Sequence, residues 1–170
     1  IFPEMSVQEN VEVVLSAYHG HSRKLFNIAS RNTGIQQEAV ELLKRLGIDS
    51  LKHQRAEVIS YGDKRLLEIA MVLATRPKLV LLDEPTAGMT PDETRRTTRL
   101  IKSLADSGDY TFLITEHDMD VVFDVADRIL VMHRGEKLFA GTPSEVKSHP
   151  EVRRAYLGEE EDEETEETGA

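Results

Sequence analysis

Three short apolar runs, separated by helix-length polar segments, constrain the fold of this chain most strongly. The runs are "LVLLD", "YTFLIT" and "RILVMH", at residues 79–83, 110–115 and 128–133, and they are rich in branched or aromatic side chains. Their β-α-β-α-β order predicts an α/β fold with a mostly parallel sheet and flanking helices. The segment "HRGEKLFAG" predicts a tight turn into an antiparallel strand at the sheet edge.

Local signals mark where several helices begin. Residues 90–93, Thr-Pro-Asp-Glu, supply an N-cap, a proline at the first helical position and a capping glutamate, and residues 142–145 repeat the device. Ser6 with Glu9 three positions later also has the form of a capping box. Residues 1 to about 58 are expected to be helical. A second amphipathic helix in this region, which ends at a glycine, places five apolar residues on one face: Ile35, Ala39, Leu42, Leu43 and Leu46.

The absence of cysteine excludes a disulfide framework and a cysteine-ligated zinc site, and it favours an intracellular compartment. No apolar run approaches the roughly 18 to 20 residues that cross a bilayer, and the first ten residues lack the basic start and apolar stretch of a secretory signal. Any link to a membrane is therefore expected to go through a partner.

The formal net charge of -10 is unevenly distributed along the 170 residues. The stretch "EEEDEETEE", residues 159–167, holds eight acidic residues, and the rest of the chain is nearly balanced. Because the stretch has no apolar residue to bury and its charges repel one another, we expect residues 159–170 to form a solvated, disordered tail. A docking role for this tail is the alternative.

Polar side chains follow two of the predicted strands at the point where each strand ends. Asp83 and Glu84 come directly after the apolar residues 79–82, which the run predicts to be buried, and Glu116 and His117 follow the next strand. Carboxyl ends of parallel strands share one rim of a sheet. A carboxylate such as Asp83 suits Mg²⁺, while Glu84, on the alternate side, is placed to orient or deprotonate a water, and His117 to hydrogen-bond a γ-phosphate. An ordinary turn with helix-capping duty is the alternative for the acidic pair.

A third polar element precedes the first strand. "ISYGDKRLLEIAMVLA", residues 59–74, places Ser60 and Gly62 at the N-terminus of a predicted helix, where backbone N–H groups bind anions. The alternative for Ser60 is a plain N-cap with Asp63 closing the box, and that role is compatible with phosphate contact.

These elements, in this order, resemble the motifs of the ATP-binding-cassette (ABC) ATPases. "ISYGD" is similar to their LSGGQ signature, "LVLLDEP" to Walker B, "ITEHDMD" to the switch-histidine segment, and "AGMTP" lies where the D-loop belongs. The resemblance covers residues 1 to about 158 and implies the fold of a P-loop NTPase. The sequence departs from the usual pattern at Tyr61, where the family commonly has glycine, and at Thr90, where the D-loop commonly has aspartate.

The resemblance implies a role for each matching residue. Ser60 and Gly62 would contact the γ-phosphate of an ATP held by the partner subunit. Asp83 would bind Mg²⁺ through water, Glu84 would be the catalytic base, and His117 would sense the γ-phosphate. The implied organisation is a helical subdomain over residues 1–76, which includes the signature, followed by the carboxyl-terminal part of the nucleotide-binding core over 77–158. Residues 1–58 match in position the helical part that docks the membrane subunits in this family.

Within the family, "YGDKRLLEIA", "AGMTPDET", "EHDMDVV" and "HPEVRRAYLGEE" look like the ATPase subunits of branched-chain amino-acid importers, with the urea or short-amide importers close behind. The ending "AYLGE" is also similar to the lipopolysaccharide-export ATPase. This implies coupling of ATP hydrolysis to import of branched-chain amino acids or a similar small polar solute. The implied partners are transmembrane permease subunits, a second ATPase subunit that is identical or a paralogue, and indirectly a solute-binding protein. The implied location is the cytoplasmic face of the inner membrane.

The G-x-x-x-x-G-K-[ST] loop that cradles phosphates in such ATPases does not occur in the 170 residues. Family order would place this loop, its strand and the Q-loop glutamine before residue 1, so the chain looks like the carboxyl-terminal part of a longer subunit. Without the loop's strand, apolar faces and strand edges would stay uncovered. We therefore expect the 170-residue piece to be poorly stable or to self-associate, and not to hydrolyse ATP alone.

Two other functions are consistent with parts of the sequence. One is a non-catalytic interaction module that binds a permease or a partner cassette without holding nucleotide itself. The other is a cassette ATPase that acts on DNA or the ribosome, against which stand the acidic charge and the importer-like ending. We expect no nucleic-acid partner, because Arg95, Arg96 and Arg99 are better explained as a solvated helical face. His19 and His21 suggest a metal site but lack a third ligand nearby.

Overall fold

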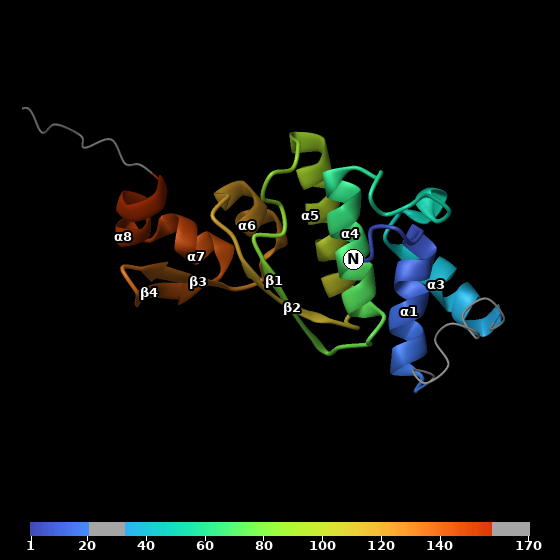
Figure 1. Ribbon diagram of the computed structural model, residues 1–170. Helices are drawn as coiled ribbons and strands as arrows, with labels where there is room; N and C mark the ends of the chain where they lie inside the picture. Colours follow the sequence, from blue (N-terminus) through green and yellow to red (C-terminus); the bar gives the residue numbers. More distant parts are fainter. Residues whose placement is uncertain (21–32, 158–170) are drawn as a thin grey trace, which may run out of the picture. The chain divides into compact units, whose positions relative to one another are not determined.

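The computed structural model describes residues 1–20 and 33–157 (Figure 1). The predicted acidic tail and His21 lie outside the described residues. The chain divides into two compact units, Ile1–Val121 and Val122–Ala170. The predicted subdomain boundary at residues 76/77 falls inside the first unit and stays a prediction. In the described ranges, no helix combines the length and apolarity that a membrane span requires.

Helices make up most of the first unit (Figure 1). They are α1 (Val7–Tyr18), α3 (Thr33–Arg45), the short 3₁₀ turn η3 (Asp49–Leu51), α4 (Tyr61–Leu73) and α5 (Pro91–Asp106). One continuous apolar core joins these helices to the first strand, which contributes Val80. The helical face predicted from the sequence is confirmed, because all five of its apolar side chains are buried: Ile35, Ala39, Leu42, Leu43 and Leu46.

The capping signals predicted from the sequence are confirmed. Capping boxes with both reciprocal hydrogen bonds begin α1 at Ser6, α5 at Thr90 and a later helix, α7 (Pro143–Ser148), at Thr142. Each box satisfies backbone N–H groups that the first turn of a helix leaves without a partner inside the helix. The helix starts are therefore fixed locally, by residues three positions apart.

Strands β1 (Leu79–Asp83) and β2 (Thr111–Thr115) pair in parallel, as predicted, with Asp83 opposite Thr115 at the carboxyl end. One face of the pair packs on the helical core through Val80, Leu82 and Phe112. The expectation that residues 79–82 are buried is wrong for alternate positions, because Leu79 and Leu81 are exposed. Leu113 beside Leu81 is exposed as well. The predicted uncovered apolar strand face is thus confirmed.

The helix α6 (Met119–Val125) follows β2 and runs into the second unit. There β3 (Ile129–His133) and β4 (Glu136–Gly141) form an antiparallel hairpin with a bulge between Val131 and Met132, as the turn signal predicted. Within the described residues of the second unit, β3 pairs with β4. The two-residue turn, with Arg134 and Gly135 at positive φ, explains the local pairing.

In the part of the second unit that the structure describes, three short helical segments follow β4. They are α7 (Pro143–Ser148), α8 (Pro150–Val152) and the π-helical turn η4 (Arg153–Leu157). The small core of this unit consists of Ile129, Val131, Val146 and Val152. The five residues singled out as site candidates all belong to the first unit.

Candidate functional site

The carboxyl ends of β1 and β2 bring Asp83 and Thr115 side by side. The two residues are paired in register, and the Thr115 hydroxyl donates a hydrogen bond to Oδ1 of Asp83. The Asp83 side chain stays exposed, with one oxygen held by the neighbouring strand. The Glu84 N–H donates to the Thr115 carbonyl oxygen at 2.9 Å, which continues the strand pairing by one residue.

Glu84 leaves the strand in an unusual backbone conformation. Its φ of 41° lies in the left-handed region, which a non-glycine residue occupies only when its surroundings hold it there. Beyond this turn, Oε1 of Glu84 lies 3.3 Å from Nδ1 of His117, and both side chains are at least half exposed. The structure therefore brings together the two residues that the sequence places on separate strand ends.

Glu116 accepts hydrogen bonds with both carboxylate oxygens, and its Oε2 accepts the His117 N–H at 3.3 Å. Its Oε1 accepts hydrogen bonds from the Thr86 N–H at 3.1 Å and from the Thr86 hydroxyl. Because Thr86 is buried, Glu116 fixes the loop that follows Glu84. Sequence reasoning missed Thr86, Thr115 and also Arg65, whose guanidinium donates to the Asp83 carbonyl oxygen at 2.7 Å from helix α4.

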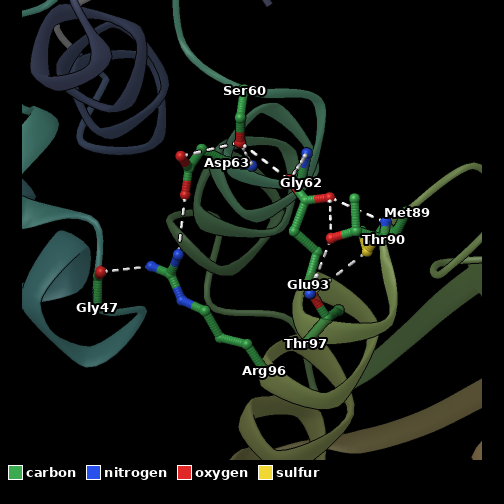
Figure 2. A network of polar contacts seen from close by, with 9 residues as sticks. All are labelled: Gly47, Ser60, Gly62, Asp63, Met89, Thr90, Glu93, Arg96 and Thr97. Atoms are coloured by element: carbon green, nitrogen blue, oxygen red, sulfur yellow. Dashed lines mark hydrogen bonds and ion pairs between the residues drawn. The ribbon is translucent and has the colours of Figure 1, made fainter.

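The N-terminus of α4 is the second part of the candidate site (Figure 2). Ser60 is the exposed N-cap, and its Oγ accepts a hydrogen bond from the Asp63 N–H at 3.1 Å. The Ser60 hydroxyl also lies within donating distance of two carboxylates, at 3.0 Å from Oδ2 of Asp63 and 3.1 Å from Oε1 of Glu93. The plain N-cap predicted as the alternative for Ser60 is thus present, and the residue remains accessible.

Glu93 is the residue of this region that sequence reasoning assigned only to a helix cap. Its Oε1 also accepts the Gly62 N–H at 3.2 Å. The pKa of Glu93 lies below its ordinary value, chiefly because the carboxylate accepts hydrogen bonds from the Thr90 backbone N–H and then from the Thr90 hydroxyl. Desolvation opposes this effect, and the hydrogen bonds from Ser60 and Gly62 add to it. Glu93 is therefore a carboxylate at neutral pH.

Arg96, one turn further along α5 than Glu93, also contacts the N-terminus of α4. Its guanidinium contacts Oδ1 of Asp63 at 3.0 Å and the carbonyl oxygen of Gly47 (Figure 2). Gly47 ends α3 with a φ of 68°. Arg96 thus ties the ends of three helices together, and its structural role accounts for one of the three arginines that recur on α5.

In the part of the chain that the structure describes, the side chain of Ser60 and the N–H of Gly62 form hydrogen bonds with Asp63 and Glu93, and not with Glu84 or His117. The two parts are therefore presented separately by one subunit. Arg65 connects the two parts of the site, because it lies on α4 and donates a hydrogen bond to the carbonyl oxygen of Asp83.

The single carboxylate of Asp83 fits a Mg²⁺ ion that keeps most of its waters, and it does not fit an ion held in a cage of protein ligands. In the described ranges there is no group of three side chains suited to caging an ion. A single exposed carboxylate matches Mg²⁺, which keeps several waters and takes further ligands from substrate phosphates. His19, one of two histidines considered as metal ligands, instead pairs with Glu38 at 3.0 Å.

Comparisons with known proteins add independent findings. A family model described as ABC transporter matches residues 1–87, and a model described as branched-chain amino acid ATP-binding cassette transporter matches residues 136–162. The "high-affinity branched-chain amino acid transport ATP-binding protein LivG" of Salmonella typhimurium is 39% identical, over 94% of this chain and 64% of that protein. BraF of Pseudomonas aeruginosa, with the same description, is 36% identical over the same shares.

The chain thus spans just under two thirds of the length of these relatives. A solved structure shows the same fold. The crystal structure of the ADP conformation of MJ1267, "an ATP-binding cassette of an ABC transporter", superposes with a TM-score of 0.74 at 29% identity, covering 93% of this chain and 65% of that one.

Proposed function

Because this chain belongs to the ABC transporter family, we propose that it is part of an ATP-binding and ATP-hydrolysing subunit of an importer. The transported solute would be a branched-chain amino acid or a similar small polar molecule. The match of residues 136–162 to the branched-chain model supports this solute class, as do the descriptions of the LivG and BraF relatives. The predicted second ATPase subunit and permease belong to the same proposal, with the subunit docked on the cytoplasmic face of the membrane.

The observation that carries the proposal is the contact between Glu84 and His117 beside Asp83. Glu84 is exposed, held in a fixed backbone turn, and placed to accept a proton from a water. His117 orients the Glu84 carboxylate and has further capacity to hydrogen-bond a phosphate oxygen. Asp83, positioned by Thr115, would hold Mg²⁺ through water; the ion, when bound, neutralises charge on the phosphates.

Ser60 and Gly62 have a complementary role in the proposal. They present a hydroxyl and a backbone N–H at the positive end of α4, and these donors would reach the γ-phosphate of a nucleotide held by a second subunit. ATP would therefore bind the closed pair of subunits better than the open pair. This difference in affinity is what drives a coupled permease between conformations.

The experiment replaces Glu84 by Gln in the complete subunit as the cell makes it. We expect ATP binding to be kept and steady-state turnover to fall by at least about 100-fold, the usual contribution of a positioned base. E136Q, a change at an exposed glutamate that begins β4, is the matched control and should leave turnover unchanged. Near-normal turnover by E84Q would refute Glu84 as the base, whereas no turnover by the unaltered complete subunit would favour a non-catalytic interaction module.

A further inference from the structure

The two oxygens of the Glu93 carboxylate accept hydrogen bonds from the N-termini of two different helices (Figure 2). Its Oε2 closes the capping box of α5, accepting the Thr90 N–H at 3.0 Å and the Thr90 hydroxyl at 2.9 Å. Its Oε1 faces α4 and accepts the Gly62 N–H at 3.2 Å and the Ser60 hydroxyl at 3.1 Å. One side chain therefore satisfies donors on elements about 30 residues apart in the sequence.

The approach of Glu93 to α4 depends on the glycine at position 62. A Cβ added to Gly62 would lie 2.6 Å from Oε1 of Glu93 and 2.8 Å from its Cδ. Any larger residue at this position would push the carboxylate away from the helix end. Gly62 itself is buried, and its N–H donates to Oε1 of Glu93.

The donors that Glu93 holds are the same two that the proposed function assigns to a γ-phosphate. A backbone N–H has one hydrogen, and so does the Ser60 hydroxyl, which Asp63 also approaches. Oε1 of Glu93 and a phosphate oxygen cannot both accept these hydrogens well, and they carry charge of the same sign. Binding of phosphate therefore competes with Glu93.

We propose that Glu93 is an internal anionic occupant of the segment 59–63, and that a phosphate reaches Ser60 and Gly62 only when Oε1 of Glu93 leaves them. This inference rests on the proposed function, since it concerns the access of nucleotide to the same donors. Oε2 can stay on Thr90 while Oε1 leaves, so the start of α5 remains capped. Glu93 is thus a positioning residue that sets how much ATP is needed to close the two subunits.

The test measures the ATP concentration that half-saturates association of complete subunits, in an E84Q background that prevents turnover. E93Q is the informative change, because Gln keeps the side-chain shape and also serves in a capping box but carries no charge. We expect E93Q to lower the half-saturating ATP concentration by about ten-fold, the order expected when one charged competitor is removed from an exposed site. Its melting temperature should stay close to that of the parent.

E145Q is the matched control. Glu145 closes the same kind of box with Thr142, with bonds of 2.7 and 2.9 Å, but it lies in the second unit of the chain. E145Q should leave the ATP response unchanged. An E93Q response equal to or weaker than that of the parent, with an unchanged E145Q response, would overturn the inference and show that Glu93 only caps α5.

S60A distinguishes a failure of the inference about Glu93 from a failure of the proposed function. If Ser60 contacts nucleotide, S60A weakens ATP-dependent association by at least about ten-fold, whatever E93Q does. If S60A associates like the parent while remaining folded by thermal melting, the assigned role of the segment 59–63 is wrong, and the inference about Glu93 falls with it.

Discussion

Nδ1 of His117 lies 3.3 Å from Oε1 of Glu84, although the two residues follow different strands and are 33 positions apart. The contact follows from the parallel register of β1 and β2, which sets Asp83 opposite Thr115 and so carries the next residues of both strands to one rim. A histidine in this place can hold the carboxylate toward a water and still face a phosphate.

Replacing His117 by Ala should lower turnover of the complete subunit by about 100-fold while ATP binding changes little, because the substitution removes the partner that orients Glu84. Steady-state kinetics with a separate nucleotide-binding assay would measure both effects. H53A, a change at an exposed histidine near η3, is the control and should behave like the parent. Turnover by H117A within two-fold of the parent would contradict a catalytic role for this contact.

Replacing Thr115 by Val should weaken the hold on Asp83 without changing the strand, because Val has the same shape and suits a strand equally well. We expect the Mg²⁺ concentration that half-saturates turnover to rise about five-fold, the order of one lost hydrogen bond. T111V alters an exposed threonine on the same face, at the other end of β2, and should have no effect. Equal responses of the two variants would show that Thr115 does not position Asp83.

The purified 170-residue chain should self-associate through the uncovered face of β1 and β2, where Leu81 is 67% and Leu113 is 58% exposed. The double change L81T/L113T should shift sedimentation toward the monomer, while V58T, at an apolar residue 66% exposed in a loop, should not. The same preparation should show no ATP turnover. A monomeric parent chain, or ordinary turnover by it, would contradict this expectation.

Glu12 should make the stability of the first unit depend on pH. The residue is 4% exposed on α1, and burial raises the pKa of its carboxyl above the ordinary value, against a hydrogen bond from Gln8. A raised pKa in the folded state means that stability is fully present below the unfolded pKa and is lost as pH rises through the folded pKa. E12Q should therefore raise the melting temperature at pH 7 and have no stabilising effect near pH 4.

The control for Glu12 is the chemically similar pair on the next helix. Gln37 donates to the exposed Glu41 four residues on, at 3.0 Å, so E41Q changes the same type of hydrogen bond without the burial. E41Q should leave the melting temperature unchanged at both pH values. If E12Q and E41Q have the same melting temperature at pH 7, then the buried, ionised carboxylate of Glu12 does not destabilise the folded state.

The features that could be predicted from the sequence are those set by neighbouring residues. The three capping boxes each need two residues three positions apart, and the apolar face of α3 follows from helical periodicity alone. The parallel pairing of β1 and β2 was predictable from the helix-length segment between them. That pairing in turn placed Asp83, Glu84 and His117 at one edge.

Features that depend on distant contacts could not be predicted in this way. The capping box identified Glu93 as a helix cap, but nothing in the sequence indicates that its second oxygen reaches Gly62 on another helix. The role of Arg65 at the end of β1 depends in the same way on how α4 packs. The apolar composition of β1 alone could not show which of its residues lie on the uncovered face, since burial depends on which elements pack against each side.

In the proposed function, Ser60 of one subunit contacts the γ-phosphate of the nucleotide on which Glu84 and His117 of the other subunit act. The most direct measurement traps the assembled complete subunits with Mg²⁺, ADP and vanadate, a mimic of the γ-phosphate, and irradiates them so that the backbone is cut where vanadate touches it. Mass spectrometry should find a cut at Ser60. Trapped nucleotide with no cut anywhere in residues 59–63 would contradict the account.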